Sequence, residues 1–179
     1  MWLRLIHQYW RVCVFKDTPA NTPYSSFLLV FVAALFFLCV LLQWFFFNSM
    51  SQVNFNDILI IGLILVTSYV FYTILLLFLF HKSARMVQTL TCLLACHTIV
   101  HAVALPLLWM MSLLNVSNSP GLLSFVLGVF YLVLSLLLSV WQFMITAHIY
   151  KHALMIKTFA AFLASLGLLG ANLLMVSFW

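Results

Sequence analysis

Four side chains that could support chemistry lie close together in the sequence: Cys92, Cys96, His97 and His101. All four fall within residues 86–113, an apolar stretch long enough to cross a bilayer. Membrane segments normally exclude ionisable groups, so imidazoles in such a stretch either bond to buried partners or take part in a function. Because His97 and His101 are four residues apart, they share one face of a helix.

Metal and haem binding are the first chemistries to test. A zinc site made from these four residues is excluded, because Cys96 and His97 point about 100° apart and one helix cannot surround a metal. Two axial haem ligands would need a second helix with a histidine at the same depth. His148 and His152 lie more than about 10 Å away along the helix axis. We therefore predict no metal and no cofactor, unless a partner subunit completes a site.

Acid–base catalysis by paired carboxylates is also excluded. Asp17 and Asp57 are the only acidic residues, and the predicted topology places them on opposite sides of the membrane. The sequence contains no nucleotide-binding loop and no nucleophile motif. We predict no catalytic residues and expect that the protein is not an enzyme.

The composition indicates a membrane protein. Of 179 residues, 67% are hydrophobic and 5% are charged, whereas about a quarter of the residues of soluble domains are charged. The net charge of +5 resides in short segments between apolar runs. These bases indicate topology and contacts with anionic lipid head groups, and no nucleic-acid partner is expected. Four cysteines, none in a predicted outer loop, do not predict a disulfide framework.

The apolar runs predict an all-α membrane protein with five transmembrane helices, preceded by a short interfacial amphipathic helix. Residues 1–23 form the amphipathic segment and its elbow, where prolines interrupt the helix. Its apolar residues recur at helical spacing at Leu3, Ile6, Trp10 and Val14. Residues 24–179 form the bundle, with spans at about 24–47, 58–80, 86–113, 122–147 and 158–178.

The charge distribution supports this count of spans. If the spans alternate in direction, all seven strong bases fall on one side, namely Arg4, Arg11, Lys16, Lys82, Arg85, Lys151 and Lys157. The opposite loops hold Asp57 and no base. The positive-inside rule then places the amino terminus inside and the carboxyl terminus outside. Short loops favour a bacterial cytoplasmic (inner) membrane over an endomembrane, with all of these bases except Lys16 predicted to contact lipid at the interface.

Counting about 1.5 Å per residue from the inner bases places His97 and His101 near the midplane. The same count brings residues of the second and fourth spans to that depth. We predict a buried polar layer made of Tyr72, His97, His101, Ser135, Ser139 and Gln142. Two interpretations remain open: the histidines bond to neutral partners and fix helix contacts, or they lie on a proton or ion path. We favour the first, because no acidic relay partner is present.

Small residues predict where helices approach closely. On the fourth span a stripe that includes Gly128 and Ser135 predicts a buried helix contact. On the fifth span the small residues are Ala160, Ala164, Gly167 and Ala171. Contacts within this chain and contacts with a second copy would leave the same pattern.

Three hypotheses for function follow. The first is a non-enzymatic accessory, assembly or scaffold subunit that acts through helix contacts, lipid contacts and its basic inner loops. Its expected partners are the lipid bilayer and other membrane subunits or further copies in a homo-oligomer. The alternative is a small oligomeric transporter or channel, in which the polar layer lines a proton-linked path. A redox-associated membrane subunit comes third.

Overall fold

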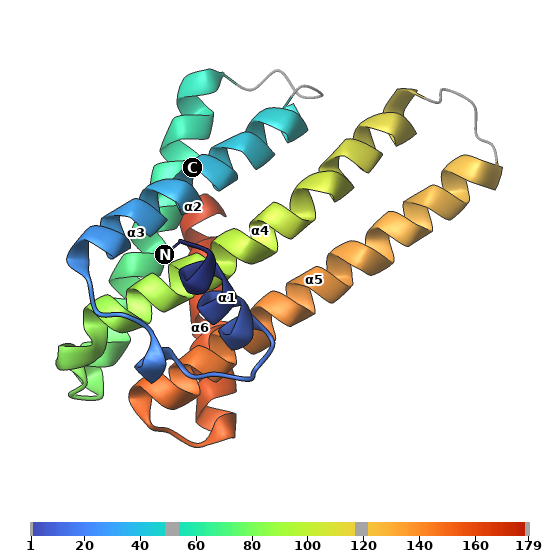
Figure 1. The fold of residues 1–179 in the computed structure, drawn as a ribbon. Coiled ribbons are helices and arrows are strands. Elements are labelled where there is room, and N and C mark those ends of the chain that lie inside the picture. The colour runs from blue at the N-terminus through green and yellow to red at the C-terminus, as the bar shows by residue number, and fades with distance from the viewer. Residues whose placement is uncertain (1, 49–53, 117–121, 178–179) are drawn as a thin grey trace.

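The computed structural model describes residues 2–48, 54–116 and 122–177. Figure 1 shows that they form a bundle of helices, and no strand occurs among them. The elements are α1 (Trp2–Cys13), η1 (Pro19–Asn21), α2 (Ser26–Asn48), α3 (Phe55–Leu79), η2 (Ser83–Arg85), α4 (Met86–Val116), α5 (Leu122–Leu154) and α6 (Thr158–Ser177).

Five helices, α2 to α6, are long and apolar enough to cross a membrane, which confirms the all-helical class and the predicted number of long apolar helices. The largest difference in bounds is at α5, which the sequence predicted to end at residue 147 and which continues to Leu154. His148, Lys151 and His152 therefore lie on its last turns and not in a loop. The helix continues because no proline or glycine follows before Met155. Phe178, at the predicted end of the last span, lies outside the described residues.

Three of the helices end in the same way. Phe15, His81 and Met155 follow α1, α3 and α5 and have positive φ angles of 60°, 55° and 58°. In each case the next amide donates back to a carbonyl five residues earlier, as in Lys82 N to Leu77 O at 2.8 Å. This is the Schellman closure, which glycine usually makes. It turns the chain back within a few residues, so that α4 and α6 start beside the ends of α3 and α5 (Figure 1).

The N-terminal helix α1 has three faces. The stripe Leu3, Ile6, Trp10 and Val14 is exposed, while the buried side chains are Tyr9, Val12 and Cys13. The buried face packs against α4, where Cys96 donates to the carbonyl of Tyr9 at 3.8 Å. The apolar stripe is therefore a separate and mostly exposed face, on which Trp10 contacts the ring of Trp141 of α5 edge-on.

The elbow after α1 is held by side chains of α4 and α5. Gln88 donates to the carbonyls of Ala20 and Thr22, at 2.8 Å and 2.6 Å. Trp141 donates through Nε1 to Cys13 O at 3.0 Å, and Nε2 of His148 lies 2.9 Å from Asp17 O. These contacts satisfy backbone carbonyls that a loop would otherwise leave open.

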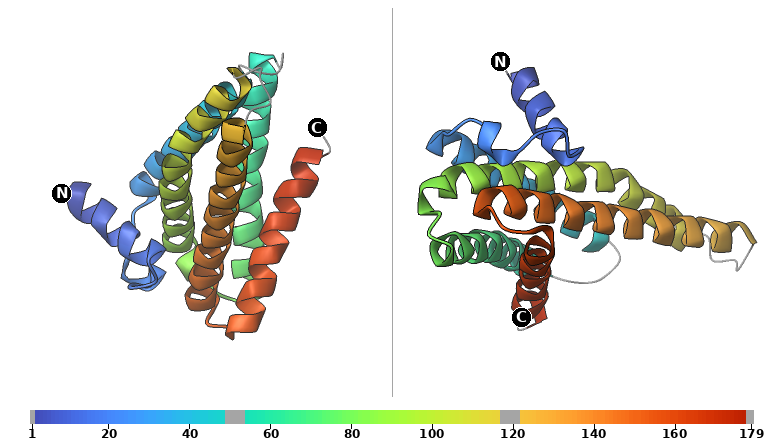
Figure 2. Two further views of the ribbon diagram at one scale, coloured as in Figure 1. Left: turned by 90° about the vertical axis from the view of Figure 1, so that its right-hand side faces the viewer. Right: turned by 90° about the horizontal axis from the view of Figure 1, so that it is seen from below.

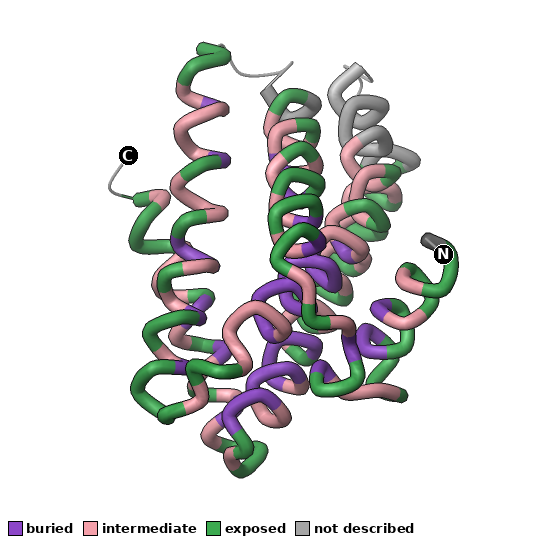
Figure 3. The backbone as a smooth tube through the Cα atoms, turned by 60° about the vertical axis from the view of Figure 1, so that its left-hand side comes forward, coloured by how far each residue is buried: buried purple, intermediate pink, exposed green. Residues whose placement is uncertain are grey.

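The buried core is concentrated at one end of the bundle. Every residue of α4 from Thr89 to His97 is buried, and α4 packs against α1, α2 and α5. On α5, by contrast, no described side chain from Phe125 to Met144 is buried. Figures 2 and 3 show the same asymmetry: α4 and α5 extend away together, and the buried segments gather near the turns between α3 and α4 and between α5 and α6.

Candidate functional site

His97 lies at the centre of a buried hydrogen-bonded network between α4 and α5. Its side chain is 2% exposed. Nε2 lies 2.9 Å from Thr146 Oγ1, and Nδ1 lies 2.9 Å from Gln142 Nε2. Both ring nitrogens are therefore occupied by partners on the facing helix.

The three contacts at His97 have one consistent assignment of hydrogens. Thr146 Oγ1 donates its single proton to Gln142 O at 2.9 Å. It must then accept from His97, which places the proton on Nε2 and leaves Nδ1 to accept from the Gln142 amide. A second bond from Gln142 Nε2 reaches the hydroxyl of Tyr69 on α3 at 3.4 Å. The network is neutral, and it joins three helices.

His101, one turn further along α4, has a different environment. Gln43 of α2 donates through Nε2 to the backbone carbonyl of His101 at 3.0 Å, so its Oε1 faces His101 Nδ1, at 2.6 Å. Nδ1 must therefore carry the proton. The remaining nitrogen, Nε2, keeps its lone pair and receives no hydrogen bond from the described residues.

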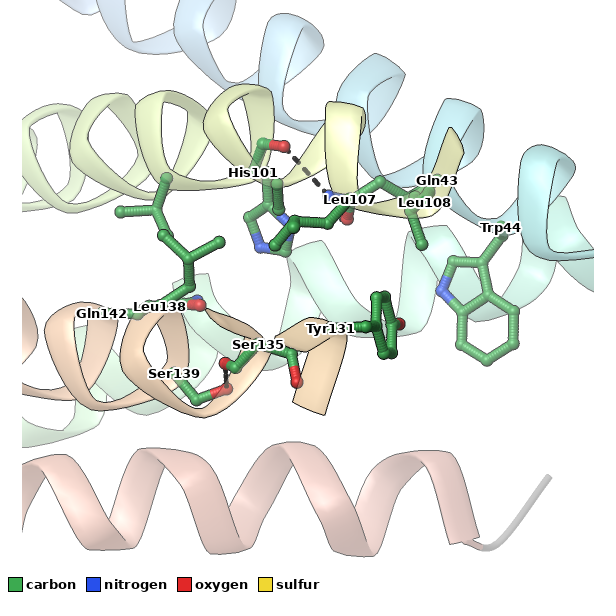
Figure 4. Close-up of a pocket in the computed structure, with 12 residues that line it drawn as sticks. Gln43, Trp44, His101, Leu107, Leu108, Tyr131, Ser135, Leu138, Ser139 and Gln142 are labelled. Carbon is green, nitrogen blue, oxygen red and sulfur yellow. Dashed lines mark hydrogen bonds between the residues drawn. The ribbon is translucent and has the colours of Figure 1, made fainter. Parts of the chain in front are cut away.

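A groove of about 380 Å³ lies beside His101, between α2, α4 and α5. Figure 4 shows the ring of His101 in this space, with Ser135 and Ser139 on the facing wall. The end of the groove nearest His101 and Gln142, called its inner end, is polar. The opposite, outer end is formed by Trp44, Leu107, Leu108 and Tyr131. The predicted layer thus contributes to the groove through four of its members: His101, Ser135, Ser139 and Gln142.

The two serines do not bond to the histidines. Ser135 donates to Leu132 O and Ser139 donates to Ser135 O, each at 2.9 Å. Their protons are thus held by the carbonyls of their own helix, and their oxygens remain available as acceptors.

Tyr72 lies elsewhere. Its hydroxyl donates to Ala164 O of α6 at 2.9 Å, next to Gly167. Beside it, the hydroxyls of Thr73 and Tyr150 lie 2.9 Å apart and are buried. Gln43, Tyr69 and Thr146 contact the layer but were not predicted to belong to it. Thr146 lies four residues after Gln142, so helical spacing puts both on one face of α5, whereas nothing in the sequence indicates how α2 and α3 are rotated.

A second cavity of about 320 Å³ lies on the other side of the layer, against α3 and α6. It shares His101, Ser139 and Gln142 with the groove. It is also lined by Asn172, whose Oδ1 is buried and has no hydrogen-bond partner among the described residues.

The cysteines of α4 are part of the core. Cys92 and Cys96 are buried with Cys13 of α1, and all are free thiols. The hydrogen bond with Cys96, together with burial, raises the pKa of the Cys13 thiol far above its usual range, so it remains protonated. Among the described residues, no group of three or more His, Cys, Asp or Glu side chains is placed to hold a metal ion.

The bases between spans gather at the end of the bundle that holds the core. Arg85 Nη1 donates to His152 O at 3.3 Å, which brings the turns that carry Lys82 and Lys151 together. Arg4 and Arg11 are exposed on α1, and Lys157 is exposed at the start of α6.

The small residues predicted to lie at helix contacts differ in their surroundings: those on α6 pack within the chain, and Gly128 on α5 does not. Ala160, Ala164 and Ala171 on α6 are partly buried, and a Cβ at Gly167 would lie 2.0 Å from the Tyr72 hydroxyl. A Cβ at Gly128 on α5 would meet no atom of the described residues within 4 Å.

Comparison of the chain with protein-family models, curated proteins and solved structures gave no match in any of the three.

Proposed function

We propose that the protein is a non-enzymatic integral membrane protein that acts as an accessory or assembly subunit, with its amino terminus inside and its carboxyl terminus outside. A bacterial cytoplasmic membrane is the proposed location. The observation that carries the proposal is the outer part of α5, where no described side chain from Phe125 to Met144 is buried. A partner membrane subunit packing on that surface would complete the bundle.

The contrast between two glycines supports a contact outside the chain. Gly167 is required by the chain's own packing, because a Cβ there would collide with Tyr72. Gly128 has open space around it, so its lack of a side chain serves no contact among the described residues. Small residues on membrane helices are typical of helix–helix interfaces.

The basic end of the bundle supports the proposed orientation. The elbow, the turn at η2 and the turn before α6 lie at the same end, linked by contacts of His148 with Asp17 and of Arg85 with His152. Lys and Arg concentrated at one end follow the positive-inside rule. The three faces of α1 support an interfacial position: one is buried in the bundle, one is apolar and exposed, and one carries Arg4, His7 and Arg11.

The partner can be tested by crosslinking in cells. A photoreactive amino acid is placed at Leu136, which is 60% exposed on α5, and at Phe71, a matched control that is 62% exposed on α3. We expect a discrete adduct with a membrane protein from Leu136 and lipid labelling alone from Phe71. Lipid labelling alone from both positions would contradict the proposal.

The groove beside His101 favours a second candidate, a proton-linked transporter. Its support is the free Nε2 of His101 among Ser135, Ser139 and Gln142, four residues of the predicted path. Inward of this level the helices are packed around buried residues such as Leu93, Ile145 and Tyr150, so transport would require them to separate. Proton flux into liposomes containing the purified protein tests it, with protein-free liposomes as the baseline.

A further inference from the structure

The inner end of the groove between α4 and α5 presents hydrogen-bond acceptors. His101 Nε2 keeps its lone pair because Gln43 fixes the proton on Nδ1. Ser135 and Ser139 have given their protons to backbone carbonyls. The amide nitrogen of Gln142 donates to His97 and to Tyr69, which leaves its Oε1 open. These four side chains therefore present acceptors to the groove, because their own donors are used by the surrounding network.

The charges around the groove exclude charged ligands. The described residues that line it include no lysine and no arginine, so an anion would lack a counter-charge. They include no aspartate or glutamate either, and a cation would lose its water shell against neutral groups alone. The ligand that fits is neutral and donates hydrogen bonds.

The shape of the groove indicates an amphiphile. From Gln142 to Tyr131 the wall on α5 extends about 16 Å, with Gln142, Ser139 and Ser135 toward one end and Tyr131 at the other. The other end is formed by Trp44, Leu107 and Leu108. The volume of about 380 Å³ lies within the range of small-molecule sites, about 300–1,000 Å³. Ser139 is exposed, so the groove opens sideways between helices, and a ligand dissolved in the bilayer could enter it.

We propose that this groove binds a neutral amphiphile with a hydroxyl head, an alcohol or a phenol, whose proton is donated to the acceptors around His101. The apolar part lies against Trp44, Leu107 and Leu108. The groove shares the segment 131–142 of α5 with the proposed partner surface, but all the residues that line it belong to this chain.

The requirement for a donor can be tested with two probes. The purified protein in phosphatidylcholine nanodiscs is titrated with 4-octylphenol and with 4-octylanisole, its methyl ether, and partition into empty nanodiscs is subtracted. We expect saturable binding of the phenol and at least tenfold weaker binding of the ether, which has no proton to donate. Equal affinities, or no saturable binding of the phenol, would overturn the proposal.

The position can be tested with two alanines of α4. Ala104 lines the groove, and Ala102 is exposed two residues away and does not. Ala104→Leu should weaken binding of 4-octylphenol at least tenfold, and Ala102→Leu should leave it unchanged. Binding that survives in Ala104→Leu would place the probe elsewhere and refute the site. If that variant does not fold, the comparison of phenol and ether on the unaltered protein still decides.

A hydroxyl head could come from a free amphiphile or from a lipid head group. Diacylglycerol is a neutral lipid with a free hydroxyl, and phosphatidylcholine has no hydroxyl in its head group. Weaker binding of 4-octylphenol in phosphatidylcholine nanodiscs that contain diacylglycerol would support the site and identify a competing lipid hydroxyl. Equal binding with and without diacylglycerol would support the site with a free amphiphile as its ligand.

Discussion

His97 and His101 show how residues of one type, on one helix face, can differ in role. His97 is fully satisfied by Gln142 and Thr146 and is buried. Hydrogen bonds between membrane helices contribute about 0.6 kcal/mol on average and up to about 1.7 kcal/mol, so this network fixes which faces of α4 and α5 meet. His101 has one nitrogen held by Gln43 and one directed to a groove. The structural interpretation fits the first histidine, and a binding role fits the second.

The network at His97 predicts the effect of removing one hydroxyl. Thr146→Val keeps the shape but leaves the Nε2 proton of His97 without an acceptor, which should lower the free energy of unfolding by about 1–2 kcal/mol. Thr98 is the matched control, because its hydroxyl bonds only to Leu94 O of its own helix, at 2.7 Å. Thr98→Val should change stability by less than about 0.5 kcal/mol. Unfolding by SDS in mixed micelles measures both, and equal losses would argue against the assigned network.

The hydrogen bonds of Asp17 predict that the elbow opens at acid pH. The Asn21 amide, at 2.6 Å, and the Thr18 N–H, at 2.8 Å, both donate to its carboxylate and hold its pKa below the usual range. The folded elbow thus favours the charged form. This stabilisation is present above the unfolded pKa of about 3.9 and is lost as the pH falls through the lower, folded pKa.

Amide hydrogen exchange of the elbow tests this at constant temperature. We expect protection of residues 14–24 to fall as the pH drops below about 4, after correction for the intrinsic pH dependence of exchange. Asp17→Asn removes the titrating group and should abolish the change. Since Asp57 is the only other acidic residue, few other side chains could cause a change in protection in this pH range. Protection that stays constant in the unaltered protein would refute it.

At the scale of elements, α6 packs on α3 where the side chain of Tyr72 lies over small residues of α6. Tyr72 of α3 donates to Ala164 O, and its ring fills the space above Gly167. The small residues of α6 therefore serve contacts within the chain at this point. The sequence alone left this contact and a contact with a second copy indistinguishable.

Two glycines of α6 provide a matched test of the contact between Tyr72 and Gly167. Gly167→Ala forces Tyr72 to move, because the added Cβ would lie 2.0 Å from its hydroxyl oxygen. We expect a loss of about 1–3 kcal/mol, typical of overpacking. A Cβ at Gly170 meets nothing within 4 Å, so Gly170→Ala should be neutral or stabilising by up to about 1 kcal/mol. If thermal unfolding shows the two variants to be equally stable, Tyr72 does not pack against Gly167.

At the scale of the whole molecule, the five apolar helices share a core whose described residues are concentrated toward one end of the bundle. Close to the turns that carry Lys82, Arg85 and Lys151, α4 is buried at every residue from Thr89 to His97. Toward the other end, α5 has no buried side chain from Phe125 to Met144. The basic end therefore holds the fold together, while the other end offers the groove and the uncovered surface of α5.

The odd number of spans predicts that the termini face opposite compartments. A reporter fused before Met1 should be active inside, and one fused after Trp179 should be active outside. A reporter inserted in the turn at Ser83 provides an internal control and should agree with the amino-terminal fusion. Both termini on the same side would show that one of the five helices does not cross the membrane.

The sequence by itself determined the class of fold and the helices. Hydropathy over each run specified five apolar helices, because a helix that crosses lipid must be apolar over about twenty residues whatever it packs against. The four-residue spacing also placed His97 and His101 on one face, since that spacing is a property of any α-helix. These are local or one-dimensional constraints, and the sequence carries them directly.

Only the tertiary structure decided which side chains meet. Lipid-facing and protein-facing surfaces of a membrane helix are both apolar, so hydropathy does not reveal how α2 and α3 rotate toward α4. That rotation placed Gln43 on His101 and Tyr69 beside Gln142, and it turned Tyr72 to Ala164. The groove exists because side chains of α2, α4 and α5 come together around His101, a geometry set by contacts between residues far apart in the chain.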